Sequence, residues 1–219
     1  TRENDPNYKP INIDDFRKRV DREVESRSGI IPKTSAVGET YFDEAYQSPI
    51  EQGYDVLSIH VSKEISATLN SATIASKKNE GNRVSIFDTQ TVSMAQGLMV
   101  IEAERMAASG TTKDEIIEIL TDMRERTTLR AVTPDLKYLV VSGRVPGVKA
   151  MVGGVLSLVP ILGIDHITDK NKVSKIRTVR KGYMAVEWMK EYIKNNNPEQ
   201  VAIVDYRARQ TTEKLKNIL

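Results

Sequence analysis

The chain has 219 residues, of which 39% are apolar and 28% are charged, and its formal net charge is +2 at neutral pH. This composition is typical of one large or two small globular domains with enough apolar material for a core. The absence of cysteine excludes disulfides, thiolate catalysis and the usual structural zinc sites, and it fits a reducing, cytoplasmic compartment. Lysine and arginine are scattered among acids, and their densest cluster, 170–181, is spaced like the solvated side of a hairpin, so we expect no nucleic-acid partner.

The longest apolar stretch, 150–164, is shorter than the ~20 residues that a membrane-spanning helix needs. It also contains Pro160 and several glycines, so we expect it in the protein interior. No signal peptide is visible. The chain has no initiator Met and stops within a helical pattern, from which we expect that strands are missing at one or both ends.

Two helices are predicted before the first strand. Asn12 is placed to cap the first helix, which carries apolar residues at a spacing of four on one face: Phe16, Val20 and Val24. The second helix is predicted over about 39–51 and ends before Gly53. Its apolar face is expected to consist of Phe42, Ala45 and Tyr46.

Apolar strands and helices then alternate. Strands are predicted over 55–61 and 83–87, and helices over about 66–78 and 93–108. A capping box, Thr112 with Glu115, starts the next helix, whose buried residues are expected to be Ile116, Ile119, Leu120 and Met123. Strands that are apolar almost throughout and joined by helices predict a parallel sheet covered on both faces. This part, 1–126, is predicted to form the N-terminal domain.

The pattern changes after about residue 127. The predicted elements are strands over 129–133, 161–167, 173–179 and 201–205, and helices around Leu139, over 148–158, around Trp188 and from near Thr211. The second and third of these strands are expected to form a hairpin. The sequence thus predicts a second α/β domain, 127–219, with a mainly antiparallel sheet, and an α/β fold of two domains overall.

Hydroxyl-bearing residues follow a proline loop and a predicted strand. Thr34 and Ser35 lie in the loop, and Ser62 and Ser66 come just after the strand over 55–61. Ligands bind at the carboxyl ends of parallel strands, where the next helix directs free N–H groups outward, so neutral hydroxyls there favour an anion. Each pair taken alone is more typical of a helix cap or a turn than of an anion site.

Other polar residues are candidates for structure or for chemistry. Asp88 and Thr89 follow a strand and are expected to fix a turn, and Arg144 is an ordinary surface residue unless the fold places it beside a ligand. His60 and His166 are the only histidines, too few and too isolated for a metal site. His60 fits a buried strand residue, with a phosphate-accepting or general-base role as the alternative. The sequence contains no Walker loop, no GxGxxG and no supported Ser–His–Asp order.

The segment 151–159 is rich in small and flexible apolar residues, with two adjacent glycines, Gly153 and Gly154. One interpretation is close helix packing through these glycines. The other is the wall of an apolar tunnel, in which glycine gives room and methionine adapts its shape to a ligand.

Together these segments resemble the DegV family of bacterial fatty-acid-binding proteins. The motifs that carry the resemblance are Pro32-Lys33-Thr34-Ser35, Ser58-Ile59-His60-Val61-Ser62, Ile65-Ser66-Ala67-Thr68, Asp88-Thr89 with Ser93, Ser142-Gly143-Arg144 and Pro160-Ile161-Leu162. The resemblance covers nearly the whole chain. It implies a two-domain α/β protein that encloses one long-chain fatty acid, of the palmitate, stearate or oleate type, between its domains. Thr34 and Ser66 would bind the carboxylate, with Ser35, Ser62, Ser93 and Arg144 as neighbours of the head group.

The resemblance also implies a role without catalysis, cofactor or metal. Such proteins can present the bound acid to a separate fatty-acid kinase, and transient contact with a membrane surface fits this role. The family's N-terminal strand and C-terminal segment are absent from this chain, and Val145-Pro146 departs from the family's residues after Arg144. Two alternatives remain: a phosphotransfer enzyme or kinase-related domain that uses His60, and a structural interaction module with a filled core.

Overall fold

The computed structural model describes residues 12, 14–16, 18, 19, 22, 34–133, 136–143, 145, 158–164, 172–205 and 209–217. The chain divides into two units, Thr1–Ser35 and Ala36–Leu219. In the first unit, the side chain of Asn12 accepts hydrogen bonds from the backbone N–H groups of Asp14 and Asp15, at 2.9 and 3.2 Å. These contacts confirm the predicted helix cap. The domain boundary predicted near residue 127 stays a prediction.

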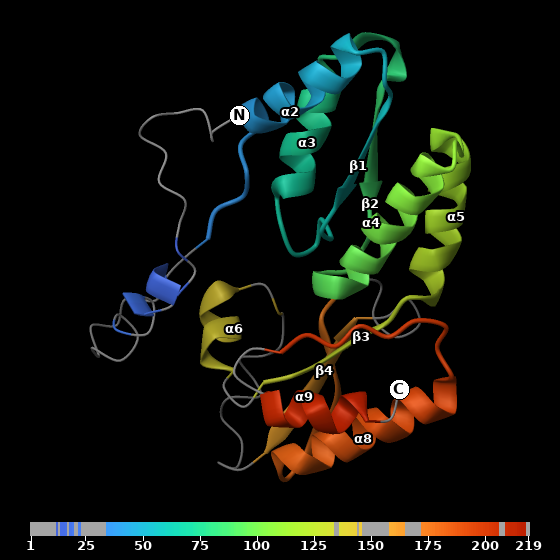
Figure 1. The fold of residues 1–219 in the computed structure, drawn as a ribbon. Coiled ribbons are helices and arrows are strands. Elements are labelled where there is room, and N and C mark those ends of the chain that lie inside the picture. Colours follow the sequence, from blue (N-terminus) through green and yellow to red (C-terminus); the bar gives the residue numbers. More distant parts are fainter. Residues whose placement is uncertain are drawn as a thin grey trace. The chain divides into compact units, whose positions relative to one another are not determined.

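The second unit begins with a helix and a strand–helix–strand unit. These elements are α2 (Glu39–Glu51), β1 (Val56–His60), α3 (Thr68–Ser76) and β2 (Val84–Asp88), with a short 3-10 turn, η2 (Glu80–Asn82), before the last strand. β1 and β2 pair in parallel, in a register that runs from Val56 opposite Val84 to His60 opposite Asp88. Figure 1 shows α2 and α3 side by side next to the two strands. The predicted parallel pairing is confirmed.

One face of this parallel pair packs on two long helices, α4 (Ser93–Ala108) and α5 (Lys113–Arg126). The core between them consists of Phe87, Met99, Ala103, Met106, Ile116 and Leu120, with Leu57 and Ile59 packed against it. Alternation along a strand puts residues 57, 59 and 87 on the same face. The predicted capping box of α5 is confirmed, because the Thr112 and Glu115 side chains each bond to the other's backbone N–H.

The opposite face of the pair is covered by α2 and α3. Tyr46 of α2 and the small residues Ala72 and Ala75 of α3 are buried there. The expectation for Ala45 is wrong, since this residue is exposed beside the buried Tyr46. A helix turns 100° per residue, so neighbours in sequence lie on different parts of its surface.

The second sheet is antiparallel, in the order β3 (Leu129–Val132), β4 (Val159–Ile164) and β5 (Ser174–Val179). The predicted hairpin is therefore confirmed, although β4 begins two residues before the predicted strand. Pro160 fits in this central strand because it lies before Ile161, where the pairing with β3 ends. Its missing N–H is therefore not needed by that neighbour. The chain is an α/β protein with a parallel pair and an antiparallel sheet, as the sequence predicts.

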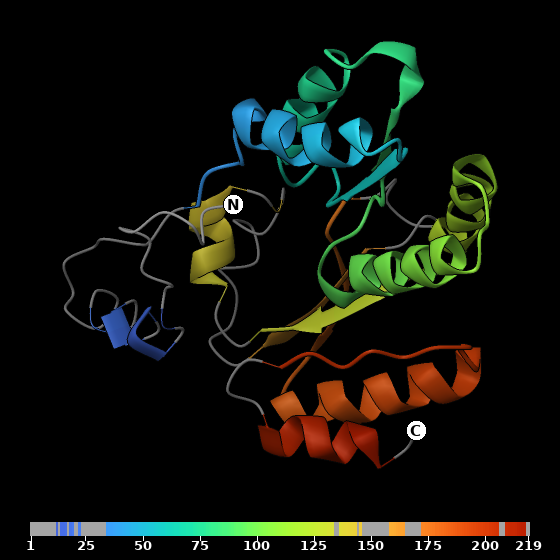
Figure 2. The ribbon, with the colours of Figure 1, turned by 45° about the horizontal axis from the view of Figure 1, so that its top comes forward.

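After residue 133, the described residues also form the helices α6 (Lys137–Ser142), α8 (Gly182–Asn196) and α9 (Arg209–Lys216). α8 packs on the antiparallel sheet, where its Ala185 joins Ile161 and Val179 in a second apolar core. Figure 2 shows α8 and α9 side by side.

Two predictions after residue 127 have a different outcome. The strand expected over 201–205 is wrong, since these residues form no regular structure. Their apolar pattern suits a strand, but no described strand pairs with them, and a strand needs a hydrogen-bonding neighbour. The helix expected over 148–158 lies outside the described residues except for Leu158, which is exposed and not helical.

Candidate functional site

The carboxyl ends of β1 and β2 lie at the same edge of the sheet because the strands are parallel, with His60 opposite Asp88. The segments that follow the two strands are hydrogen-bonded to each other. The backbone N–H of Ser62 donates to the carbonyl of Thr91 at 2.9 Å, and the N–H of Thr89 donates to the carbonyl of His60 at 3.1 Å. This edge is where α/β sheets commonly bind ligands.

Ser62 organises the turn after β1. It is fully buried, and its carbonyl oxygen accepts hydrogen bonds from the N–H groups of Ile65 and Ser66, both at 3.0 Å. Its hydroxyl oxygen accepts from the N–H of Glu64 at 3.2 Å. Ser62 thus holds the position of Ser66, and its own place beside a head group stays a prediction.

Ser66 lies just before the start of α3 and is only partly buried. Its hydroxyl is 2.8 Å from the hydroxyl of Thr68, and its oxygen accepts from the Thr68 N–H at 3.3 Å. The helix begins at Thr68, two residues later than predicted, and the cap position is taken by Ala67, which has no side-chain bond. When Thr68 donates to Ser66, the Ser66 proton is free to donate to an anion.

The backbone around Ser66 adds two further donors. No described residue accepts a hydrogen bond from the N–H of Ala67 or of Leu69. Unpaired N–H groups and the positive end of a helix dipole both favour a negative charge at this position. The arrangement is therefore suited to hold an anion through neutral donors.

The turn after β2 is built from its own side chains. The Asp88 carboxylate accepts a hydrogen bond from the Gln90 N–H at 2.9 Å, and the buried Thr89 hydroxyl donates to the His60 carbonyl at 2.7 Å. Gln90 has a positive φ of 55°, which its place in this tight turn accounts for. The structural role predicted for Asp88 and Thr89 is confirmed.

Ser93 opens α4 on the solvent side of this turn. It is exposed, has a φ of 59°, and follows the cap residue Val92, which makes no side-chain bond. Its hydroxyl is thus accessible, and its role as a head-group neighbour stays a prediction.

His60 is buried at the end of β1, with 6% of its surface exposed. Its Nε2 is 2.7 Å from the Ser58 hydroxyl, and its ring forms a T-shaped contact with the ring of Phe42 at a centroid distance of 5.3 Å. Burial lowers the pKa of His60 below its ordinary value, and the nearby charge of Asp88 opposes this shift. A buried, neutral imidazole whose Nε2 is engaged by a serine favours the structural interpretation over phosphotransfer.

The hydrogen-bonded chain that ends at His60 was not found by sequence reasoning. The Tyr46 hydroxyl of α2 is 2.7 Å from the Ser58 hydroxyl, which in turn contacts His60. Burial raises the pKa of Tyr46, while the bond to Ser58 lowers it. The spacing of Ser58 and His60 places both on one face of β1, but no local pattern indicates that Tyr46 packs above them.

Thr34 and Ser35 are exposed and lie outside helices and strands, at the end of the first unit. The relative positions of the two units are not determined, so the proximity of Thr34 to Ser66 stays a prediction. Arg144, His166 and the glycine-rich segment 151–157 lie outside the described residues.

The described residues contain no cluster of three or more His, Cys, Asp or Glu side chains that could bind a metal ion. Over the same residues, no helix combines the length and the apolar character that crossing a membrane requires.

Comparison with known proteins identifies the family. A model of the DegV family, described as uncharacterised proteins, matches residues 7–219. The chain belongs to the DegV family. A DegV domain-containing protein from Listeria innocua is 33% identical over 194 residues, which are 87% of this chain and 66% of the relative. The chain spans 47% of the length of a curated relative from Deinococcus radiodurans and 68% of the length of one from Clostridium perfringens.

Solved DegV structures share the fold. A fatty-acid-binding DegV protein from Streptococcus agalactiae aligns with a TM-score of 0.82 at 23% identity, covering 95% of this chain and 72% of that protein. A protein from Thermotoga maritima aligns with a TM-score of 0.72 at 28% identity, covering 94% of this chain and 70% of that protein. The structure of the latter is described as revealing a fatty-acid-binding function.

Proposed function

We propose that the chain binds one long-chain fatty acid and carries it, with the hydroxyls of Thr34 and Ser66 as donors to the carboxylate. Ser35, Ser62, Ser93 and Arg144 are the proposed neighbours of the head group. The acid lies in an apolar tunnel and is presented to a fatty-acid kinase, and the exchange of ligand includes transient contact with a membrane surface.

The observation that carries the proposal is the environment of Ser66. Its hydroxyl can donate outward when Thr68 donates to it, and the N–H groups of Ala67 and Leu69 have no described acceptor. This set offers donors for a carboxylate without a basic side chain, which avoids the cost of burying an ion pair. Membership of the DegV family and the fatty-acid-binding function described for the Thermotoga relative support the same ligand class.

The two ends of a fatty acid contribute to binding in different ways. Burying methylene groups contributes ~0.8 kcal/mol each, so the tail supplies most of the affinity. Neutral donors mainly orient the carboxylate. They also leave it nucleophilic, because neutral donors do not cancel its charge as a buried lysine clamp would, and phosphorylation by a kinase requires an attacking carboxylate oxygen.

The direct test is native mass spectrometry of the purified protein, followed by extraction and identification of any bound acid. The proposal expects one fatty acid per chain, or uptake of added palmitate, stearate or oleate to that ratio. A ligand-free mass that added fatty acids do not change would contradict it. Conversion of the bound acid to an acyl phosphate by a fatty-acid kinase with ATP tests the presenting role separately.

Single substitutions test the two proposed donors. Ser66→Ala and Thr34→Ala are each expected to weaken palmitate binding by about 1–3 kcal/mol, measured by titration calorimetry. Ser76→Ala is the matched control, because the Ser76 hydroxyl donates to the Thr73 carbonyl at the other end of α3. Equal affinity of Ser66→Ala and Ser76→Ala would remove Ser66 from the site.

A further inference from the structure

Thr89 is completely buried, and its side chain joins the ends of the two parallel strands. Its hydroxyl donates to the carbonyl of His60 at 2.7 Å, and the same oxygen accepts from the Thr91 N–H at 3.4 Å. The backbone N–H of Thr89 also donates to the His60 carbonyl, at 3.1 Å. One threonine therefore holds the last residue of β1 and the turn after β2 together.

From Thr91, two further hydrogen bonds connect Thr89 to the proposed carboxylate donor. The Thr91 carbonyl accepts from the Ser62 N–H at 2.9 Å, which sets the position of Ser62. The Ser62 carbonyl accepts from the Ser66 N–H at 3.0 Å, which sets the position of Ser66. These hydrogen bonds link Thr89 to Ser66 in series. A substitution at Thr89 therefore changes the position of Ser66 although the two residues are not in direct contact.

We propose that Thr89 is a positioning residue for carboxylate recognition: it orients the Ser66 hydroxyl through Thr91 and Ser62. The inference rests on the proposed function. Without the Thr89 hydroxyl, the His60 carbonyl keeps its bond to the Thr89 N–H, so the strands stay paired, while the Thr91 N–H loses its acceptor. The turn after β2 then becomes less rigid. The turn after β1, which carries Ser66, is no longer held in a fixed position.

The experiment compares the binding of palmitate with that of palmityl alcohol, which has the same tail and no carboxylate. In Thr89→Val, which keeps the shape and removes the hydroxyl, the Kd for palmitate is expected to rise about tenfold while the Kd for the alcohol stays within about twofold. Thr89→Ser is expected to restore the wild-type ratio of the two constants. The matched control is Thr121→Val, which removes a hydroxyl that donates to the Ile117 carbonyl within α5.

The ratio separates positioning from stability, because partial unfolding weakens the binding of both ligands equally. A wild-type ratio in Thr89→Val, with palmitate still bound by the wild type, would overturn the inference and leave the proposed function intact. If the wild type binds no palmitate at all, the proposed function itself fails.

Amide hydrogen exchange in the wild type provides a second measurement that does not depend on the folding of Thr89→Val. Palmitate is expected to slow exchange at the N–H groups of Ser62, Ser66 and Thr91 together. Slowing at Ser66 alone would overturn the inference.

Discussion

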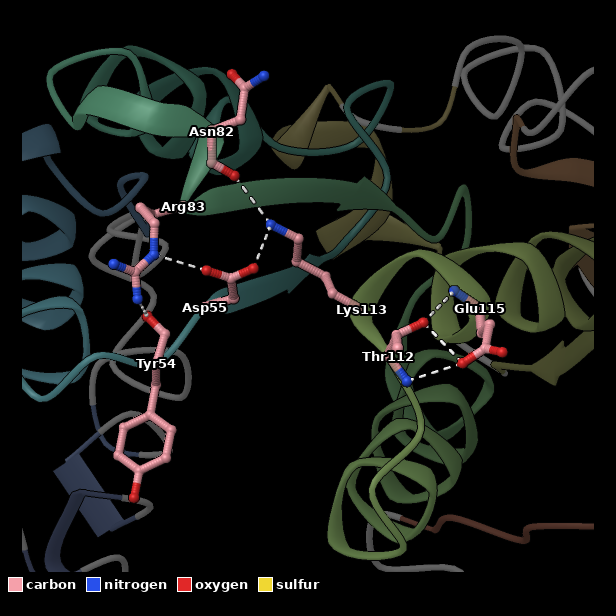
Figure 3. Close-up of polar contacts among 7 residues, drawn as sticks. All are labelled: Tyr54, Asp55, Asn82, Arg83, Thr112, Lys113 and Glu115. Carbon is pink, nitrogen blue, oxygen red and sulfur yellow. Dashed lines mark hydrogen bonds and ion pairs between the residues drawn. The ribbon is translucent and has the colours of Figure 1, made fainter.

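Lys113, the first residue of α5, forms an ion pair with Asp55, which directly precedes β1, at 3.2 Å between Nζ and Oδ2 (Figure 3). The other carboxylate oxygen of Asp55 accepts from Nε of Arg83, at 2.7 Å, and Arg83 directly precedes β2. Lys113 also donates to the carbonyl of Asn82, and Arg83 to that of Tyr54. One carboxylate therefore connects the starts of both parallel strands and of α5, at the sheet edge opposite the candidate site.

Asp55→Asn is expected to destabilise the protein at neutral pH and to lose this effect in acid. The hydrogen bond from Arg83, followed by that from Lys113, holds the pKa of the Asp55 carboxyl below its usual value. A lowered folded-state pKa contributes stability above the unfolded value of about 3.9, and this contribution is lost as the pH falls through the folded-state pKa. Urea unfolding of the variant and the wild type should therefore differ at neutral pH and converge in acid.

Glu44→Gln is the control for this prediction, because Glu44 is exposed on α2 and its side chain forms no hydrogen bond or ion pair with a described residue. The difference in stability between Glu44→Gln and the wild type should not follow the pH dependence expected for Asp55→Asn. A constant difference between Asp55→Asn and the wild type across the whole pH range would contradict the assigned role of the Asp55 charge.

Thr112→Ala is expected to destabilise the protein by about 1 kcal/mol, because it removes the capping box of α5. The Thr112 hydroxyl donates to the Glu115 carboxylate at 2.7 Å and accepts from the Glu115 N–H at 3.4 Å. Thr112→Ser keeps both bonds and should retain most of the stability. Thermal or urea unfolding measures both variants, and equal stability of the Ala and Ser variants would show that the cap is not needed.

Leu120→Ala is expected to destabilise the protein by about 2–5 kcal/mol, because it opens a cavity in the core of α4, α5 and the parallel pair. Leu120 has no exposed surface, whereas its neighbour Ile119 is 45% exposed. Ile119→Ala should therefore cost less than about 1 kcal/mol. Urea unfolding of the two variants tests the packing directly, and similar losses of stability in both variants would contradict it.

The difference between Leu120 and Ile119 shows where sequence reasoning stops. Apolar spacing predicted α5 correctly, together with its buried Ile116 and Leu120, but it also assigned Ile119 to the core. An amphipathic pattern gives the direction of the buried face and not its width, which depends on the neighbouring elements. The expected strand over 201–205 failed for a related reason, since a strand also depends on a partner that is distant in sequence.

The candidate site also has a part that the sequence predicts and a part that it does not. The positions of Ser62 and Ser66 after a parallel strand followed from local pattern, because ligand sites recur at strand ends. The hydrogen bonds from the Thr89 hydroxyl to the His60 carbonyl and from the Ser62 N–H to the Thr91 carbonyl join segments about thirty residues apart. Such contacts are set by the register of the two strands, and no local sequence pattern indicates either pair of partners.

The pH dependence of stability is expected to include a contribution from His60. Burial lowers its folded-state pKa, so between that value and the unfolded value of about 6.5 the unfolded chain binds more protons than the folded protein. The contribution of His60 to the free energy of unfolding should thus be complete above about pH 6.5 and should fall as the pH decreases towards the folded-state pKa. His60→Gln, which cannot titrate, should lack this slope, so urea unfolding from about pH 8 to 5 should show the two proteins changing differently below about pH 6.5. Parallel curves over that range would mean that the imidazole is as accessible to protons in the folded protein as in the unfolded chain, and would reopen the phosphotransfer alternative at His60.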